Sequence, residues 1–362
     1  MNRSSLLAAL LAGATQCLSS AHAAPLDALL SANKPATPGS VEVEAAYDVV
    51  NSTVDIFNIR DKDTDYAGTE VGDYRGAHVR AGVAVTPELW LDGGFWQRRI
   101  DYQRDQAKIQ TWQIGAQYKL FDAAGYRPAM AVRLGAWGNS AGNLEKTSPT
   151  QFRGSTLGTV RVDSPEDRQY QLDLVATWAL KDTLEVSTFA GAGTSKTKID
   201  AVSGTATLAG CNYNLAFTQT NFVGTLAQPC AGGIQRVEGR NSTLGINVFD
   251  EAQYSARFLH GGVSGKWRSG PWQLRAGYQY QRLDRGQIDD TIEQRGGKAV
   301  KSNHIVVGEV AYRLTTNLSL FGRGQYMTNQ FTGEIPFAYN TFTAGRFDKR
   351  YGIVTVGLAA DF

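Results

Sequence analysis

The most constraining feature of this sequence is its final segment, residues 351–362 (YGIVTVGLAADF), in which apolar residues alternate with small or polar ones. Successive side chains of a strand point to opposite faces. As a strand, this segment places Val356, Leu358 and the terminal Phe362 on one face and Asp361 on the other. The period of two therefore predicts a strand with one apolar and one polar face.

The same alternation recurs along most of the chain and predicts an all-β fold of about twelve strands. The expected strands are residues 41–50, 77–85, 89–99, 111–120, 129–139, 170–180, 183–196, 254–267, 272–283, 304–314, 318–326 and 351–362. The connections alternate strictly between short ones (86–88, 121–128, 181–182, 268–271, 315–317) and longer ones (51–76, 100–110, 140–169, 197–253, 284–303, 327–350). Transmembrane barrels sort their connections in this way, with short periplasmic turns and longer outer loops. We therefore predict a transmembrane antiparallel up-and-down β-barrel over residues 41–362, with a long outer loop at 197–253.

A final strand that ends in an aromatic residue, here Phe362, resembles the last strand of Gram-negative outer-membrane β-barrel proteins. The resemblance extends to the porin-like class as a whole, and no motif points to one specific family. It implies residence in the outer membrane of a Gram-negative bacterium, contact with outer-membrane lipid and lipopolysaccharide, and recognition of the final strand by the barrel-assembly machinery.

The first residues have the pattern of a secretory signal sequence. Arg3 precedes a short apolar run at residues 6–13, and Ala21-His22-Ala23 is a small-x-small cleavage site. This pattern predicts a signal peptide at residues 1–23. Residues 24–40 are then a periplasmic N-terminal lead, in which residues 27–32 are expected to form a short turn at the periplasmic mouth.

The charge balance of the chain excludes some partners. Its 36 Lys and Arg residues nearly balance its 34 Asp and Glu residues. No basic face is expected, so nucleic acid is not a predicted partner, and no cofactor is expected. The mean hydropathy of −0.28 is compatible with a membrane barrel, because its strands are apolar only on the lipid side.

Two cysteines, Cys211 and Cys230, lie in the same long loop, 197–253. In an oxidising compartment such a pair is expected to form a disulfide. The loop is also too apolar for a wholly solvated segment. We expect it to fold into the barrel as a constriction or to cap the barrel.

Strand parity assigns a set of side chains to the lumen, where they would line it or bind a small solute. These candidates are Glu42, Glu44, Arg80, Asp92, Trp96, Arg98, Lys119, Arg133, Trp137, Arg275, Arg313 and Arg323. Both signs of charge are present, which favours pairing across the lumen over a filter of one sign. Trp96 and Trp137 beside Arg98 and Arg133 would suit a sugar or an anionic organic solute, and packing of two bulky rings in the lumen is the alternative.

Two further patterns concern strand ends and phase. Trp90, Trp178, Trp267 and Trp272 lie beside short turns and are expected to form an interfacial aromatic belt. The alternation changes phase near residues 261–262, which predicts a β-bulge.

The sequence gives only weak support for a metal site or an enzymatic site. Asp61, Asp63 and Asp65 resemble the start of an EF-hand loop, but the glycine and the bidentate glutamate that this loop needs are missing. A solvated acidic loop is the favoured interpretation. His260 and Ser264 are four residues apart on one strand, about 13 Å, whereas the outer-membrane phospholipase family has its His and Ser two residues apart.

The sequence thus predicts a porin-like channel for passive or selective passage of small solutes. The alternative is a non-conducting barrel that serves as an accessory or docking component of an envelope export or surface assembly. An outer-membrane hydrolase is the least favoured hypothesis.

Overall fold

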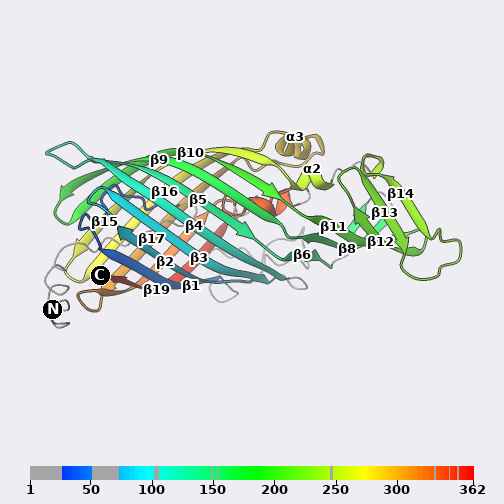
Figure 1. The fold of residues 1–362 in the computed structure, drawn as a ribbon, viewed down its shortest axis with the longest axis horizontal. Coiled ribbons are helices and arrows are strands. Elements are labelled where there is room, and N and C mark those ends of the chain that lie inside the picture. The colour runs from blue at the N-terminus through cyan, green and yellow to red at the C-terminus, as the bar shows by residue number, and fades with distance from the viewer. Residues whose placement is uncertain are drawn as a thin grey trace, which may run out of the picture.

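Twelve strands close into one antiparallel barrel (Figure 1). The computed structural model describes residues 27–50, 73–101, 106–147, 150–152, 155–244, 248–329, 332–341, 343–348 and 350–362. In chain order the barrel strands are β1 (Val41–Val50), β2 (Asp73–Ala84), β3 (Leu89–Asp101), β4 (Gln106–Phe121), β5 (Ala129–Ser140), β9 (Glu166–Lys181), β10 (Leu184–Lys198), β15 (Ser255–Ser269), β16 (Trp272–Asp284), β17 (Ser302–Arg313), β18 (Leu318–Met327) and β19 (Tyr351–Asp361). Strand β1 pairs with β19, which closes the ring. The predicted fold class is confirmed, and each expected strand overlaps one of these twelve.

The outer surface of the barrel is apolar. In β16 the exposed residues include Trp272, Leu274 and Tyr278, whereas Gln273 and Gln279 between them are buried. The same alternation runs round the ring, with exposed aliphatic and aromatic side chains on strand after strand. Since a soluble protein does not expose a continuous apolar band of this size, this surface is suited to acyl chains.

The aromatic belt is confirmed only in part. Trp267 and Trp272 are exposed on the outer surface beside the short turn that joins β15 to β16, and Trp178 is half-buried. Trp90, however, is buried, and the Nζ atom of Lys34 lies 5.6 Å from the centroid of its ring. Its parity on β3 equals that of Asp92, so it faces the lumen and its assignment to the belt is wrong.

The expected bulge at residues 261–262 is also absent. Strand β15 pairs residue by residue with β10 and with β16 through Gly261 and Gly262. The two glycines weaken the alternation in the sequence, because they carry no side chain to mark a face. His260 and Ser264 therefore keep the same parity and both face the lumen.

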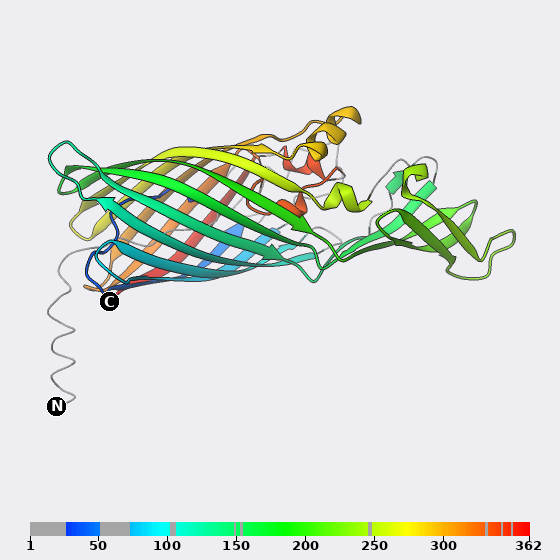
Figure 2. The same cartoon turned by 45° about the horizontal axis from the view of Figure 1, so that its top comes forward.

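A second sheet extends beyond the end of the barrel opposite to the short turns (Figures 1 and 2). Its strands, in spatial order, are β14 (Arg236–Arg240), β13 (Asn221–Leu226), β12 (Cys211–Phe217), β11 (Ala201–Leu208), β8 (Ser155–Asp163) and β6 (Asn143–Lys146), and β7 (Thr150–Phe152) also pairs with β8. Loop 197–253 thus pairs with loop 140–169, and the expectation that it constricts or caps the barrel is wrong. Its apolar residues, including Tyr213 and Leu215, pack on one another within this sheet.

The helices are short. They are η2 (Asn241–Leu244), α2 (Val248–Ala252), α3 (Gln287–Gln294), η3 (Pro336–Ala338) and α4 (Ala344–Phe347). Within the ranges that the structure describes, no helix is both long enough and apolar enough to cross a bilayer.

The expected disulfide is present. Cys211 and Cys230 are bonded, with their Cα atoms 5.8 Å apart, and Cys211 begins β12 in the projecting sheet. The bond closes a loop within this sheet and touches no barrel strand.

Reduction of the Cys211–Cys230 disulfide is expected to loosen the projecting sheet and leave the barrel intact. Chain-entropy arguments assign roughly 3 kcal/mol to a loop of this length. Limited proteolysis should cut residues 201–240 faster after reduction, and the Cys211→Ser/Cys230→Ser variant should behave alike. Loss of the strand signal in circular dichroism on reduction would contradict the separation of the two sheets.

A charge on the lipid-facing surface should destabilise the barrel according to its depth. Leu174 lies near the middle of β9 with 47% of its surface exposed, and Leu180 lies beside the periplasmic turn. We expect Leu174→Arg to lower the free energy of unfolding by about 2–4 kcal/mol and Leu180→Arg by about 0–1 kcal/mol. Urea unfolding in phosphatidylcholine vesicles measures both values, and equal effects would argue against a bilayer around this surface.

Candidate functional site

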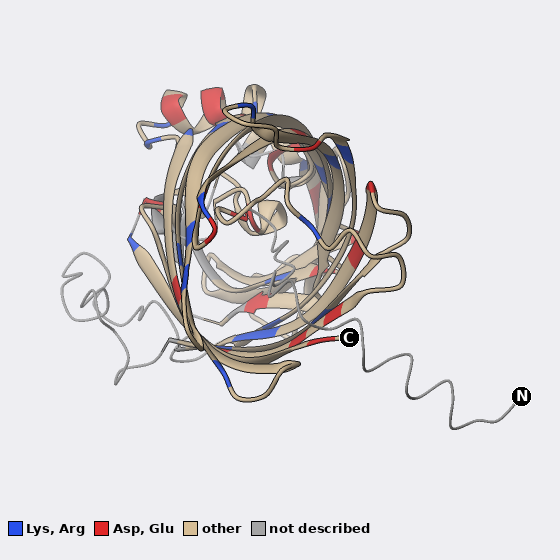
Figure 3. Cartoon of the chain, turned by 90° about the vertical axis from the view of Figure 1, so that its left-hand side faces the viewer, with Lys and Arg blue, Asp and Glu red and all other residues tan. Residues whose placement is uncertain are grey.

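Two segments of the chain lie inside the ring of strands, as the view along the barrel shows (Figure 3). We call residues 27–36 the N-terminal plug and residues 332–341, from the connection between β18 and β19, the outer-loop plug. Both contain buried residues, among them Ala28 and Leu30 in the first and Ile335 and Phe337 in the second. The lumen is therefore the candidate functional site, and these two plugs occupy it in the present structure.

The N-terminal plug is held on the periplasmic side of the lumen by polar contacts with the wall. Gln117 donates a hydrogen bond to the carbonyl oxygen of Ser31 (3.0 Å), and the hydroxyl of Ser264 donates to that of Leu30 (3.0 Å). The backbone N–H of Ala32 donates to the hydroxyl of Thr177 (2.8 Å). The expected turn at the periplasmic mouth thus exists at residues 28–29 but lies inside the barrel.

One wall glycine allows this plug to approach closely. A Cβ atom on Gly277 of β16 would lie 2.0 Å from the carbonyl oxygen of Ala28, well inside van der Waals contact. Only glycine permits this approach. Leu30 and Ala32 also pack against Val175 and Phe189 of the wall.

The outer-loop plug closes the opposite half of the lumen. Asn139 donates to the carbonyl oxygen of Glu334 (2.8 Å), and the hydroxyl of Tyr254 donates to that of Pro336 (2.8 Å). The carboxylate of Glu334 lies 2.6 Å from a guanidinium nitrogen of Arg98. Ile335, Phe337 and Tyr339 belong to the largest apolar cluster of the described residues. This segment, and not loop 197–253, is the outer loop that folds inward.

Most lumen charges are paired along the wall. Arg133 binds both oxygens of Asp92 at 2.6 and 2.8 Å, across strand β4. Gly115 of β4 lies between them, and a Cβ there would be 2.4 Å from the Arg133 guanidinium. The absence of a side chain at Gly115 therefore allows this pair to form.

A second network runs along the wall across the seam between β1 and β19. Glu309 pairs with Arg275 and with Arg323 (2.9 Å), and Arg323 reaches Glu44 (3.2 Å). His78 lies between Glu44 (3.0 Å) and Asp48 (2.9 Å). The two signs expected in the lumen thus pair with neighbours along the wall and not across the lumen.

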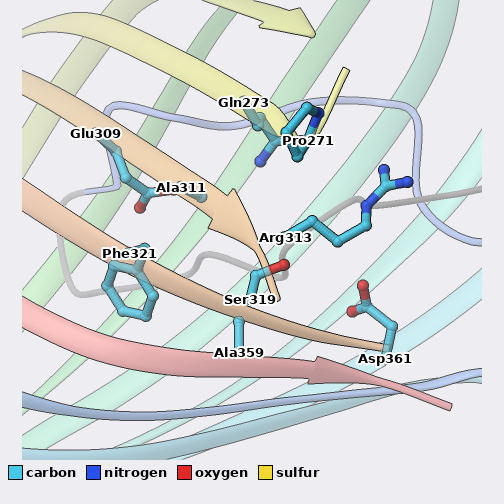
Figure 4. A pocket seen from close by; sticks show the side chains of 9 residues that line it. All are labelled: Pro271, Gln273, Glu309, Ala311, Arg313, Ser319, Phe321, Ala359 and Asp361. Carbon is cyan, nitrogen blue, oxygen red and sulfur yellow. The ribbon is translucent and has the colours of Figure 1, made fainter. Parts of the chain in front are cut away.

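The remaining candidates lie at various depths. Glu42 is buried, whereas Lys119 is half-buried and pairs with the exposed Asp122 of the adjacent turn (2.6 Å). Arg313 is exposed at the periplasmic mouth. There it lines a cavity of about 10 Å³, with Asp361 beside it and Glu309 at the deeper end (Figure 4). A cavity of this size holds about one water molecule.

Trp96 and Trp137 are buried in the lumen. The ring of Trp96 stacks on that of His78 with centroids 5.4 Å apart, and Trp137 packs against Phe258 at 6.1 Å. The cations expected beside them are occupied, because Arg98 pairs with Glu334 and Arg133 with Asp92. A solute-binding role for these four residues stays a prediction.

Arg80 is the exception among the buried cations. It is 4% exposed, its Nη1 atom makes no hydrogen bond, and no carboxylate lies at ion-pair distance from it among the residues that the structure covers. Its guanidinium carbon lies 5.9 Å from the centroid of Trp96. The carboxylates that act on it from beyond ion-pair distance are those of Glu44 and Asp92 on the wall and that of Asp27 in the N-terminal plug.

Sequence reasoning missed Asp27, Glu334 and Gly277 as site residues. Asp27 and Glu334 lie outside the strands, so strand parity does not apply to them. Gly277 shares the parity of Arg275 on its strand, but nothing in the sequence indicates that a backbone approaches it. The repeated small residues of the N-terminal plug are the one available signal, since small residues permit close packing.

The two plug carboxylates share one electrostatic property. Burial raises the pKa of Asp27, and Arg80 and Lys34 offset that increase only in part. Burial likewise raises the pKa of Glu334, against the opposing effect of Arg98. Neither carboxylate is fully compensated in the lumen, so the plugs are held mainly by their backbone hydrogen bonds and apolar contacts.

The residues of the hydrolase hypothesis have other partners. His260 hydrogen-bonds to Asp173 (2.5 Å), and Ser264 donates to the N-terminal plug. The acidic residues Asp61, Asp63 and Asp65 lie outside the described residues, and the described ranges contain no cluster suited to a metal ion.

A closed ring with an apolar outer band and a polar, charged interior has the inverted polarity of a membrane-spanning barrel. The chain is an outer-membrane β-barrel. No family model and no curated protein matches it.

Solved structures with the same architecture have low sequence identity to this chain. The translocator domain of the autotransporter NalP from Neisseria meningitidis aligns over 90% of this chain and 89% of its own, with 10% identity and a TM-score of 0.46. The NanC porin aligns over 89% of this chain and 100% of its own, with 8% identity and a TM-score of 0.42. The Pseudomonas putida toluene transporter TodX aligns over 90% of each chain, with 8% identity and a TM-score of 0.41. The assignment to the outer-membrane class therefore depends on the barrel's own geometry.

The Arg133–Asp92 pair should be important for stability. Arg133→Gln leaves Asp92 buried without its partner, so we expect a loss of about 3–5 kcal/mol in the free energy of unfolding. Lys119→Gln, whose partner is exposed, should cost about 0–1 kcal/mol. Urea unfolding measures both, and adding Asp92→Asn to Arg133→Gln should recover part of the loss. Equal effects of the two single substitutions would show that the pair is not buried as described.

Proposed function

We propose that this outer-membrane barrel is a gated channel for small polar solutes, and that the N-terminal plug and the outer-loop plug close it in the present conformation. The observation that carries the proposal is the nature of the material in the lumen. It consists of two segments from outside the strands, and the wall behind them is polar.

The wall supports this proposal through its uncharged residues. Gln113, Gln117 and Gln279 face the lumen, are buried, and have side-chain oxygens without a hydrogen-bond donor in the described part of the chain. Buried amide oxygens normally have a partner, which water supplies where protein does not. A wall of this kind suits a hydrated passage better than a permanently packed core.

The contacts of the N-terminal plug also favour a gate. In the described part of the chain, five hydrogen bonds join it to the wall, four of them at its own backbone (Leu30, Ser31 and Ala32) and one between the hydroxyls of Ser31 and Thr177 (3.4 Å). No covalent bond or ion pair to the wall is present among the described residues. These hydrogen bonds contribute on the order of 1 kcal/mol each. Withdrawal toward the periplasm, where residues 37–40 enter, is therefore energetically accessible.

The alternative, an accessory or docking barrel, is less well supported. It would use the N-terminal lead as its contact with a periplasmic partner. In the described conformation residues 27–32 lie within the lumen, with Ala28, Leu30 and Ala32 buried there. They are not available to a partner unless the plug leaves, and its departure would open the lumen on that side.

Removal of the N-terminal plug should raise conductance. Deletion of residues 27–36 is expected to increase the mean single-channel current in planar bilayers, because the periplasmic half of the lumen is then clear. Gly277→Ala should raise the open probability without a deletion, since its Cβ would collide with the carbonyl oxygen of Ala28. Gly308→Ala on the next strand is the matched control, because a Cβ there meets nothing within 4 Å.

Folding of each variant is verified by heat-modifiable migration on gels before currents are recorded. A folded deletion variant and a folded Gly277→Ala variant that both fail to conduct would overturn the channel proposal and leave the accessory role. A current in Gly308→Ala equal to that of Gly277→Ala would remove the N-terminal plug as the gate.

A further inference from the structure

Four lumen residues on two adjacent strands form one wall patch. His78 and Arg80 lie on β2, and Trp96 and Arg98 lie on β3. In the pairing of these strands His78 is opposite Trp96, with Arg80 two residues further toward the periplasm and Arg98 two residues further toward the outer side. We call this set the Arg80–Arg98 patch. It places one guanidinium group on each side of an indole ring along the path of the lumen.

The two guanidinium groups differ from the other lumen cations because neither forms an ion pair with a carboxylate on a barrel strand among the described residues. Arg133, Arg275 and Arg323 pair with carboxylates on barrel strands, so their partners stay when the plugs leave. Arg98 instead pairs with Glu334 of the outer-loop plug. Arg80 has no ion-pair partner in the described chain. The carboxylates that act on it from beyond ion-pair distance are those of Glu44 and Asp92 on the wall and that of Asp27 in the N-terminal plug.

Each plug thus brings one carboxylate to this wall patch. The Oδ1 atom of Asp27 accepts a hydrogen bond from the backbone N–H of Leu29 (2.7 Å). The Oδ2 atom is buried and has no hydrogen-bond partner among the described residues. Withdrawal of both plugs would leave Arg80 and Arg98 facing the lumen without the carboxylates of Asp27 and Glu334. His78 does not need an anion from the plugs or from a solute, because its two ring nitrogens remain hydrogen-bonded to the wall carboxylates of Glu44 and Asp48.

We propose that the Arg80–Arg98 patch is a binding site for organic anions with carboxylate groups, and that Asp27 and Glu334 occupy this site as internal substitutes when the channel is closed. The proposal deepens the proposed function, on which it rests, by naming the solute class. Guanidinium groups bind carboxylates through charge-assisted hydrogen bonds of fixed geometry. A solute that supplies the carboxylates competes with the plugs and shifts the lumen toward the open state.

The energetics permit this exchange. Burial raises the pKa of both plug carboxylates, so neither is held as favourably in the lumen as in water. On displacement both carboxylates regain full hydration. A free solute carboxylate can approach Arg80 more closely than Asp27 does, because it is not tied to a backbone that is fixed at Gly277. The solute therefore gains contacts at Arg80 that the plug does not make.

The test measures exposure of the N-terminal plug in the full chain. Ser31→Cys places a thiol in the plug, and Cys17→Ser makes it the only free thiol, since Cys211 and Cys230 are bonded. The rate of maleimide labelling in detergent is followed with succinate, with acetate and with the uncharged succinamide. Succinate is expected to raise the rate about fivefold or more in a saturable way, acetate to raise it less, and succinamide to leave it unchanged.

Charge variants assign the effect to the patch. Arg80→Gln and Arg98→Gln should each weaken the succinate effect, whereas Lys119→Gln, a lumen cation near the periplasmic turn, should leave it intact. No change of rate with succinate, or an equal change in Arg80→Gln and Lys119→Gln, would overturn the site. An increase that inorganic phosphate reproduces at the same concentration would overturn the preference for carboxylates.

This result is independent of the conductance experiment. A deletion variant that conducts while succinate has no effect on labelling refutes the anion site and keeps the channel. A succinate effect that depends on Arg80 in a barrel that never conducts keeps the site and refutes the channel.

Discussion

The structure depends on the exclusion of unpaired polar groups from the bilayer. No water in the hydrocarbon region satisfies a backbone N–H or C=O, so the strands must close into a ring, as β1 and β19 do. Charged side chains on the strands are subject to the same penalty and must face inward. The interior therefore accumulates Glu44, Arg133 and Glu309 together with many other charges, and the arrangement of the lumen follows from the need to satisfy them.

That need is met in two ways. Pairs such as Asp92–Arg133 are complete within the wall and persist whatever the lumen contains. Arg98, in contrast, obtains its partner from a segment that is not part of the ring, and Arg80 is paired with no wall carboxylate. Complete wall pairs stabilise the cylinder. Where a cation takes its partner from a plug, departure of that plug leaves an unpaired positive charge in the lumen. This link between the plugs and the charge of the lumen is the physical basis of the gating proposed above.

The local sequence pattern explains why one long outer connection forms a projecting sheet and another enters the lumen. Residues 201–226 continue the alternation of apolar and polar residues, so they form three strands. The first of these pairs with residues 155–163, and the strands bury their own apolar face outside the barrel. Residues 332–341 have no such alternation but contain Ile335, Phe337 and Tyr339, which have no partner strand. Their apolar side chains are buried in the lumen instead.

The sequence by itself determined the ring: the period of two, the alternation of short and long connections, and the inward parity of residues such as Arg80 and Trp96 are local properties that closure preserves. Trp90 shows how a local cue can mislead: its position beside a turn suggested the belt, whereas its parity on β3, shared with Asp92, places it inward, where the structure has it. Only the tertiary structure decided what fills the lumen. The site at Asp27, Gly277 and Glu334 forms from segments that are far apart in the chain. Whether a segment without alternation enters the ring depends on the space and the charges that the closed wall leaves. No local sequence pattern encodes these two properties.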